Sequence, residues 1–203
     1  MAAFHYAGRA HGLRAPRGTD PGSLPRLISY FGMRPILAID VNGVLVPDVV
    51  MPGKPPDGWR DTWTVPGGYP VRYCPDHGIK LQAVARATGA ELVWCTMWED
   101  EANTDLAPLV GLPPLPVVPM GPGKMGLRFS IPGVTVGMGK ARRMAAWAGA
   151  RPFCWLEDEP DAPGELAGYP VPHLVIGVDP LEGLQDRHLI RAAAWLSALA
   201  GAA

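Results

Sequence analysis

Short apolar runs recur along most of this chain and alternate with stretches of helical periodicity. Runs of this length, bounded by glycine, proline or charged residues, are typical of buried β-strands. Five segments have this pattern, namely residues 35–40 (PILAID), 91–96 (ELVWCT), 115–120 (LPVVPM), 152–158 (PFCWLED) and 173–179 (HLVIGVD).

Between these runs, apolar residues recur at the spacing of one helix face, and several such stretches end at a glycine. The helical segments are residues 78–89, 99–111, 139–150 and 187–201. Strands that alternate with helices in compact units predict a parallel sheet covered by helices on both faces. The fold class is therefore α/β, a three-layer Rossmann-like domain.

Two stretches depart from this alternation. Residues 58–74 (GWRDTWTVPGGYPVRYC) show period-two patterning around a Pro-Gly-Gly turn, which predicts a β-hairpin inserted after the first strand. Residues 126–137 predict a second, smaller hairpin.

The length of 203 residues suits one domain with a full core. Residues 1–32 are rich in Arg, Gly and Pro and lack a periodic apolar face, so we expect a loosely packed N-terminal extension. The domain then spans residues 33–203, with an insert at about residues 47–78.

The composition argues against several classes of protein. A formal net charge of −1 provides no broad field for nucleic acid, and no apolar run is long enough to span a membrane. Three cysteines without a CxxC pair argue against a disulfide framework and a structural zinc site. Together these features favour a cytoplasmic globular protein.

Polar residues gather where the predicted strands end. Asp40 ends the first strand, Thr96 the second, and Glu157 with Asp158 the fourth, while Lys140 opens the helix before the fourth. In an open parallel sheet the carboxyl ends of the strands form the ligand crevice. Carboxylates that meet there repel one another unless a cation lies between them. This combination is suited to holding Mg²⁺ and a phosphoryl group.

Four motifs in this order, "AIDVNGVL", "WCTMWEDEAN", "GKARRMAAWA" and "CWLEDEPD", resemble those of the haloacid dehalogenase-like superfamily. The resemblance covers roughly residues 34–198. Within the superfamily, the sequence is similar to a group of small actinobacterial members. It implies the strand order 5-4-1-2-3, numbered along the chain. The insert at residues 47–78 is too short for a large cap domain, so a small β-hairpin flap is expected over the site.

The resemblance also implies roles for single residues. Asp40 matches the nucleophile that forms an aspartyl-phosphate, and Thr96 the hydroxyl that holds phosphoryl oxygens. Lys140 matches the lysine that neutralises the charge of the nucleophile and of the phosphoryl group, and Lys124 is the alternative candidate for this role. The metal ligands would be the carboxylate of Asp40, the backbone carbonyl of Asn42 and the acidic pair, in which Asp158 is favoured over Glu157.

Asn42 departs from the pattern, because phosphatases of this superfamily have an aspartate there that protonates the leaving group. An amide does not exchange a proton in this range. Four explanations stay open: a weakened hydrolase acting on a small phosphorylated substrate, a catalytically silent protein that binds a phosphorylated ligand or nucleotide, an introduced substitution, or a different reaction of the superfamily.

Aromatic residues of the expected flap offer a further hypothesis. Trp59, Trp63, Tyr69 and Tyr73 present flat faces suited to a base or a sugar. For Trp59 and Trp63, packing of the hairpin on the sheet is the favoured interpretation. Glu159 is expected on an exposed loop.

Overall fold

A four-stranded parallel sheet forms the centre of the molecule. The computed structural model describes residues 32–48, 54–63, 70–120 and 139–201. The strands are β1 (Ile36–Ile39), β4 (Glu91–Trp94), β5 (Phe153–Glu157) and β6 (His173–Gly177), in the order β4-β1-β5-β6, and every neighbouring pair is parallel. The α/β class with a parallel sheet is confirmed.

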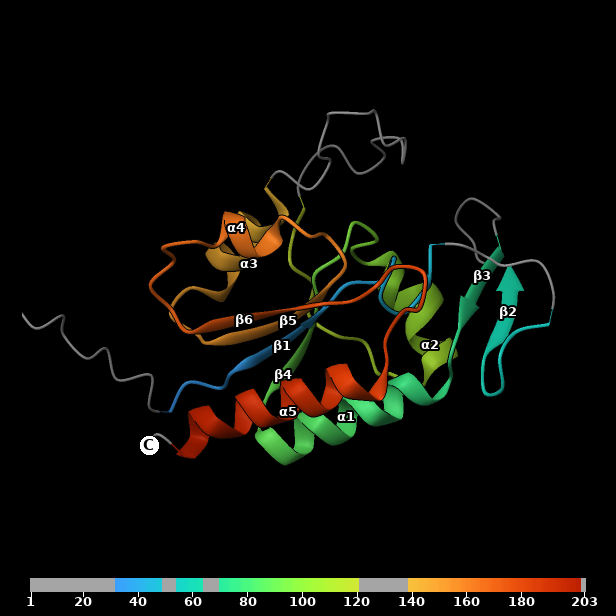
Figure 1. The fold of residues 1–203 in the computed structure, drawn as a ribbon, viewed down its shortest axis with the longest axis horizontal. Helices are drawn as coiled ribbons and strands as arrows, with labels where there is room; N and C mark the ends of the chain where they lie inside the picture. Colours follow the sequence, from blue (N-terminus) through green and yellow to red (C-terminus); the bar gives the residue numbers. More distant parts are fainter. Residues whose placement is uncertain (1–31, 49–53, 64–69, 121–138, 202–203) are drawn as a thin grey trace, which may run out of the picture.

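Helices cover both faces of this sheet, as Figure 1 shows. Helices α1 (Asp76–Thr88) and α5 (Asp186–Gly201) lie side by side on one face, and α3 (Lys140–Ala148) and the short α4 (Ala162–Glu165) lie on the other. Because side chains alternate along a strand, successive residues of each central strand supply two separate cores. Leu37, Ile39 and Leu156 face α1 and α5, whereas Ile36, Phe153 and Trp155 face α3 and α4.

The helix predicted over residues 99–111 is interrupted. It consists of a π-helical turn, η1 (Ala102–Leu106), followed by a single α-helical turn, α2 (Ala107–Val110). Pro108 lies in the first turn of α2, and without an N–H it cannot continue a regular helix. The side chain of Asn103 in η1 binds both backbone groups of Leu115, at 2.8 and 2.9 Å, and thereby fixes the next segment.

The strand predicted over residues 115–120 does not form. Only one isolated parallel bridge joins Val117 to Trp94 at the edge of the sheet. On one side of this bridge Pro116 has no N–H to donate to β4, and on the other side the Met120 N–H donates to Glu99 Oε1, at 2.6 Å, and not to the strand. The prediction of a strand at residues 115–120, the third of the five along the chain, was wrong for this reason.

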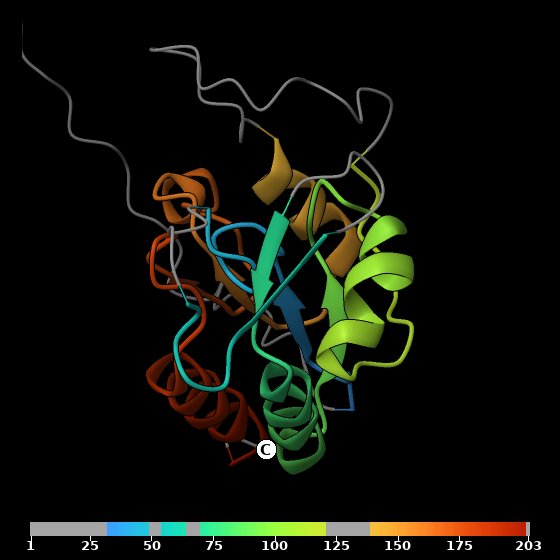
Figure 2. The same cartoon turned by 90° about the vertical axis from the view of Figure 1, so that its right-hand side faces the viewer.

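The antiparallel hairpin expected after the first strand is present. Strands β2 (Arg60–Trp63) and β3 (Pro70–Tyr73) pair with Arg60 opposite Tyr73. They lie beyond one end of the sheet in Figure 1 and therefore in front of β1 in Figure 2. Arg72 and Asp61 join the two strands through a bidentate ion pair, with contacts of 2.7 and 2.9 Å. The hairpin expected at residues 126–137 and the extension at residues 1–31 lie outside the described residues.

None of the helices in the described part of the chain has the length and apolar character to cross a bilayer.

Candidate functional site

The carboxyl ends of β1 and β5 bring three acidic residues together. Asp40 directly follows β1, Glu157 is the last residue of β5, and Asp158 comes next. The two strands are parallel neighbours, and the Asp40 N–H donates to Leu156 O at 3.1 Å. One carboxylate oxygen of each acid lies within 4.8 Å of the others. The meeting of Asp40, Glu157 and Asp158 is thus a consequence of the strand pairing.

A tight turn after β1 shapes one wall of the site. The carbonyl oxygen of Val41 accepts hydrogen bonds from the N–H groups of Val44, Leu45 and Val46, at 3.3, 2.9 and 2.8 Å. Gly43 has a φ of 67°, and a Cβ atom there would overlap the carboxylate of Asp158. Glycine at this position therefore lets the backbone beside Asn42 approach Asp158.

Lys140 is buried against two of the three acids. Its Nζ lies 2.7 Å from Asp40 Oδ2, with hydrogen-bond geometry, and 2.8 Å from Glu157 Oε2. Lys140 is the first residue of α3, and Gly139 before it has a φ of 117°, a value that favours glycine. The structure thus places Lys140 of the two candidate lysines in the cluster, while Lys124 lies outside the described residues.

The charges of the cluster shift one another's protonation. Burial lowers the pKa of Lys140, but the carboxylates of Asp40 and Glu157 outweigh it and hold the pKa well above its usual value. Burial, reinforced by the charge of Asp40, raises the pKa of Glu157 and that of Asp158. Because three carboxylates face a single lysine here, the cluster favours binding of a further cation or protonation of one acid.

The carboxylate of Glu157 is enclosed by the protein, and its two oxygens contact different groups. Glu157 has no exposed surface, and its Oε1 accepts the backbone N–H groups of Asp158 and Glu159, both at 3.2 Å. Among the described residues, its Oε2 contacts only the ammonium of Lys140, at 2.8 Å. Because that ammonium is shared with Asp40, the acids outnumber the positive charge, and a hard cation or a metal-bound water would find carboxylate oxygens to bind here. The site thus fits a hard divalent cation with oxygen ligands.

The other two predicted residues are near this edge but make no recorded contact with the acids. Thr96 follows β4 and is fully buried, and its Oγ1 accepts the Trp98 N–H at 3.3 Å. Asn42 is half-buried, and its backbone forms an isolated bridge with Val46. Of the six predicted site residues, the structure brings four together, namely Asp40, Lys140, Glu157 and Asp158. The other two, Asn42 and Thr96, lie in the loops that follow β1 and β4.

Two residues near the site were not foreseen as part of it. Trp155 is fully buried on β5, and Lys140 Nζ lies 5.6 Å from the centre of its indole ring. Trp155 comes two residues before Glu157, and alternate residues of a strand point to the same face. This spacing in the sequence could have identified Trp155 as a neighbour of the site. Glu159 is half-buried rather than exposed, and burial raises its pKa.

The described aromatic residues of the flap serve packing. Trp59 meets the imidazole of His77 edge-on, with 5.2 Å between ring centres, and Tyr73 is buried in the core. Tyr69 and the side chain of Trp63 lie outside what the structure describes. Packing is thus the observed role of Trp59.

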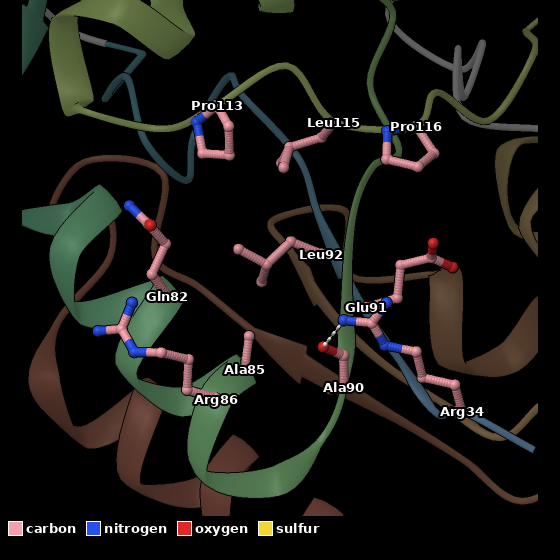
Figure 3. Close-up of a pocket in the computed structure, with 10 residues that line it drawn as sticks. All are labelled: Arg34, Gln82, Ala85, Arg86, Ala90, Glu91, Leu92, Pro113, Leu115 and Pro116. Carbon is pink, nitrogen blue, oxygen red and sulfur yellow. Dashed lines mark hydrogen bonds between the residues drawn. The ribbon is translucent and has the colours of Figure 1, made fainter. Parts of the chain in front are cut away.

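The structure also contains a hollow of about 300 Å³, shown in Figure 3, which is separate from the acidic cluster. Its lining includes Glu91, the first residue of β4, and Arg34, just before β1. It therefore lies at the amino end of these strands, opposite the end that bears Asp40 and Thr96.

Comparison with known proteins adds no identity to this geometry. No family model, curated protein or solved structure matches the chain.

Proposed function

We propose that this protein is a Mg²⁺-dependent hydrolase that acts on a small phosphorylated substrate through an aspartyl-phosphate on Asp40. The observation that carries the proposal is the buried Asp40–Lys140 ion pair, flanked by Glu157 and Asp158 at the carboxyl end of the sheet. In this proposal the protein is a haloacid dehalogenase-like member, and residues 115–120, beside β4, occupy the place of the third strand in the order 5-4-1-2-3.

Asp40 is suited to nucleophilic attack because its two oxygens are held from different sides. Its Oδ1 accepts the Val41 N–H at 2.7 Å, and its Oδ2 accepts from Lys140. In the first step an Asp40 oxygen forms a bond to phosphorus while the bond between phosphorus and the leaving oxygen breaks. In the second step water attacks the same phosphorus, which releases inorganic phosphate and regenerates the Asp40 carboxylate.

Lys140 and Thr96 have supporting roles in this scheme. The ammonium of Lys140 orients Asp40 and offsets the negative charge that accumulates as the phosphoryl group arrives. Thr96 uses its oxygen as an acceptor for Trp98, so its hydroxyl proton is free to be donated to a phosphoryl oxygen.

Asp40, Asp158 and the backbone carbonyl of Asn42 would hold Mg²⁺, with Glu157 accepting from a metal-bound water. Such an ion, when bound, would neutralise phosphoryl charge. The approach of the three carboxylates within 4.8 Å and the close approach of Gly43 to Asp158 support this assignment.

Asn42 determines what kind of hydrolase this is. Without a carboxylic acid at position 42, the leaving oxygen takes its proton from water, and the loss of general acid–base assistance costs roughly 10²- to 10⁴-fold in rate. We therefore infer that the preferred substrates have good leaving groups. The second candidate, a catalytically silent protein that binds a phosphorylated ligand or nucleotide, is supported by the same amide.

Restoring the carboxylate separates these candidates. The unmodified chain and Asn42→Asp are assayed with Mg²⁺ against a panel of phosphate esters that differ in leaving-group pKa. We expect Asn42→Asp to raise turnover on poor leaving groups by roughly 10²-fold and to change turnover on activated aryl phosphates much less. This dependence on the leaving group isolates the missing acid from a general change in folding or metal binding.

Two controls accompany this assay. Asn-Gly sequences deamidate, so mass spectrometry of the segment containing Asn42 must show that no converted protein accounts for slow turnover. Asp40→Asn, added to Asn42→Asp, must abolish the activity. A folded, metal-binding Asn42→Asp protein that hydrolyses none of the panel would exclude hydrolysis by this route and favour the binding protein.

A further inference from the structure

The segment after α2 has a buried residue at every third position. Leu112, Leu115 and Val118 are buried, and the structure records no helix or strand between them apart from the bridge at Val117. Three residues per turn is the repeat of a polyproline II helix. Each buried residue directly precedes a proline, and that position is restricted to extended conformations. The sequence itself therefore favours this conformation.

The body of the protein holds this segment firmly along its buried side. Asn103 binds both backbone groups of Leu115, and Trp94 binds Pro116 O and the Val118 N–H, each at 2.8 Å. Leu112 N–H donates to Ala107 O at 2.8 Å. The segment is thus pre-organised, so that a partner would not have to order it on binding.

With three residues per turn the segment has three sides, of which one is buried, and the other two carry exposed prolines. Pro113, Pro116 and Pro119 follow one side at the same three-residue interval, and Pro114 lies on the other. We call these four residues the proline ridge. The carbonyl oxygens of Pro113 and Pro114 accept no hydrogen bond from the described residues. The ridge therefore presents proline rings and free acceptors, the two features that aromatic-lined grooves recognise in polyproline II segments.

The hollow of about 300 Å³ lies directly beside this ridge. Figure 3 shows Pro113, Leu115 and Pro116 across the opening from Gln82, Ala85 and Arg86 of α1. Leu92 and Ala85 make its inner surface apolar, while Arg34 and Arg86 add positive charge at its edge. The one acid of the lining, Glu91, is paired with Arg151 at 2.6 Å. The hollow thus suits an aromatic ring next to a negative charge.

We propose that the proline ridge and this hollow form a docking surface for a protein domain with an aromatic-lined, acid-flanked groove of the kind that binds polyproline II segments. An aromatic side chain of the partner fills the hollow against Pro113 and Pro116, and an acidic side chain pairs with Arg86. The hollow lies at the amino end of the strands, whereas the ridge runs along the edge strand β4 and reaches its carboxyl end at Pro119. None of these residues belongs to the acidic cluster, so the inference does not depend on the proposed hydrolysis.

The extent of the ridge favours a protein partner over a small molecule. Pro119 lies beyond the residues that line the hollow, so a small aromatic acid would fill the hollow and leave the rest of the ridge uncovered. A groove of stacked aromatic side chains covers both.

The test uses the full chain labelled with ¹⁵N and two purified probes, an SH3 domain and a WW domain, titrated separately. We expect saturable shifts confined to Leu112, Leu115 and Val117 and to the facing turn of α1. Pro113→Ala combined with Pro116→Ala should weaken binding by about tenfold or more, because central contacts dominate such interfaces. Arg86→Gln should weaken it less, and increasingly so at low salt.

Matched variants control for composition and fold. Pro163→Ala removes an exposed proline on the other face of the sheet, and Arg142→Gln removes an exposed arginine from α3; neither should change binding. Absence of saturable binding by both domains, or binding that the proline variants leave unchanged, would overturn the proposal. So would binding of N-acetyltryptophan alone in the hollow, or a concentration-dependent dimer that shifts the same residues, since these would assign the surface to a small molecule or to a second copy.

Discussion

Helices α3 and α1 both begin with a buried basic side chain, on opposite faces of the sheet, yet the two side chains are in opposite charge states. Lys140, the first residue of α3, is held as a cation by Asp40 and Glu157. His77, the second residue of α1, is held neutral, because burial together with the charge of Lys80 lowers its pKa to about 4.

A helix N-terminus disfavours a cation at either place, so the dipole does not account for the difference. The neighbours do. Two buried carboxylates approach Lys140 within 2.8 Å, whereas the opposing charges near His77 largely cancel, since Lys80 is itself paired with Asp186 at 2.6 Å. His77 Nδ1 finds no hydrogen-bond partner among the described residues. Burial of a basic group thus produces a charged site only where the fold supplies uncompensated acids.

Removing the buried cation tests this comparison most severely. Lys140→Met leaves Asp40 and Glu157 buried without their partner, and losing one member of a buried ion pair costs roughly 3–5 kcal/mol. We expect a loss of that size in the free energy of unfolding near neutral pH, measured by urea denaturation, together with loss of any hydrolysis. The loss should shrink as the pH falls and the acids protonate.

The double variant Lys140→Met, Glu157→Gln is the control for this prediction. It removes one charge of each sign, so it should recover part of the stability but none of the activity. A single variant as stable as the unmodified chain would show that Lys140 does not compensate the acids.

The second prediction concerns His77 and acid. The folded-state pKa of about 4 lies below the usual value of 6.5, so the unfolded chain binds the proton more tightly. The stability contributed by neutral His77 is complete above the unfolded pKa and is lost as the pH falls toward the folded one. Between about pH 7 and about pH 5 we expect this residue alone to cost about 2 kcal/mol.

His77→Phe keeps a ring against Trp59 and removes the titration. The difference between the two pH profiles isolates His77 from the acidic cluster, whose raised pKa values act with the opposite sign. Parallel profiles for the two proteins would mean that His77 does not titrate in this window.

The third prediction separates backbone strain from the geometry of the acidic cluster. Gly43→Ala places a side chain at a φ of 67° and against the Asp158 carboxylate, whereas Gly89→Ala has nearly the same φ, 71°, with nothing within 4 Å. Each should lose roughly 1–2 kcal/mol from the left-handed conformation. Only Gly43→Ala should also weaken Mg²⁺ binding in calorimetry, because it displaces Asp158. Equal Mg²⁺ affinity in both variants would contradict the place of Asp158 in the site.

The smallest effect is expected at the exposed ion pair beside His77. Lys80→Gln should change stability by less than about 1 kcal/mol, since exposed pairs contribute little. It should nevertheless raise the pKa of His77, and Asp186→Asn should lower it, because the two charges act on the imidazole with opposite sign. NMR titration of the imidazole measures both, and shifts of the same sign would show that these charges do not govern it.

Much of the α/β alternation could be predicted because it depends on local pattern. The strands at residues 36–39 and 153–157 and the helix α1 appear within a few residues of their expected bounds. Prediction failed at residues 115–120, where an apolar run suggested a strand. Pro116 lacks a donor there, the Met120 N–H donates to Glu99, and Asn103 and Trp94 hold the segment through single contacts in place of a ladder.

The site divides in the same way. Asp40, Glu157 and Asp158 could be predicted to meet, because residues that end neighbouring parallel strands lie at one edge. That Glu157 is fully buried against Lys140 could not be predicted, nor could the position of Lys140 over Trp155. Both depend on how α3 packs on the sheet.

The sequence by itself determined the chemistry of the polar groups and most of the order of the strands and helices, because hydrophobic periodicity acts over a few residues. Only the tertiary structure decided which groups are charged. The lysine that begins α3 and the histidine in the first turn of α1 are both buried, and their protonation follows from partners distant in sequence, Asp40 lying 100 residues from Lys140. Electrostatic energy depends on distance and solvent exclusion in space, and neither can be read from neighbours along the chain.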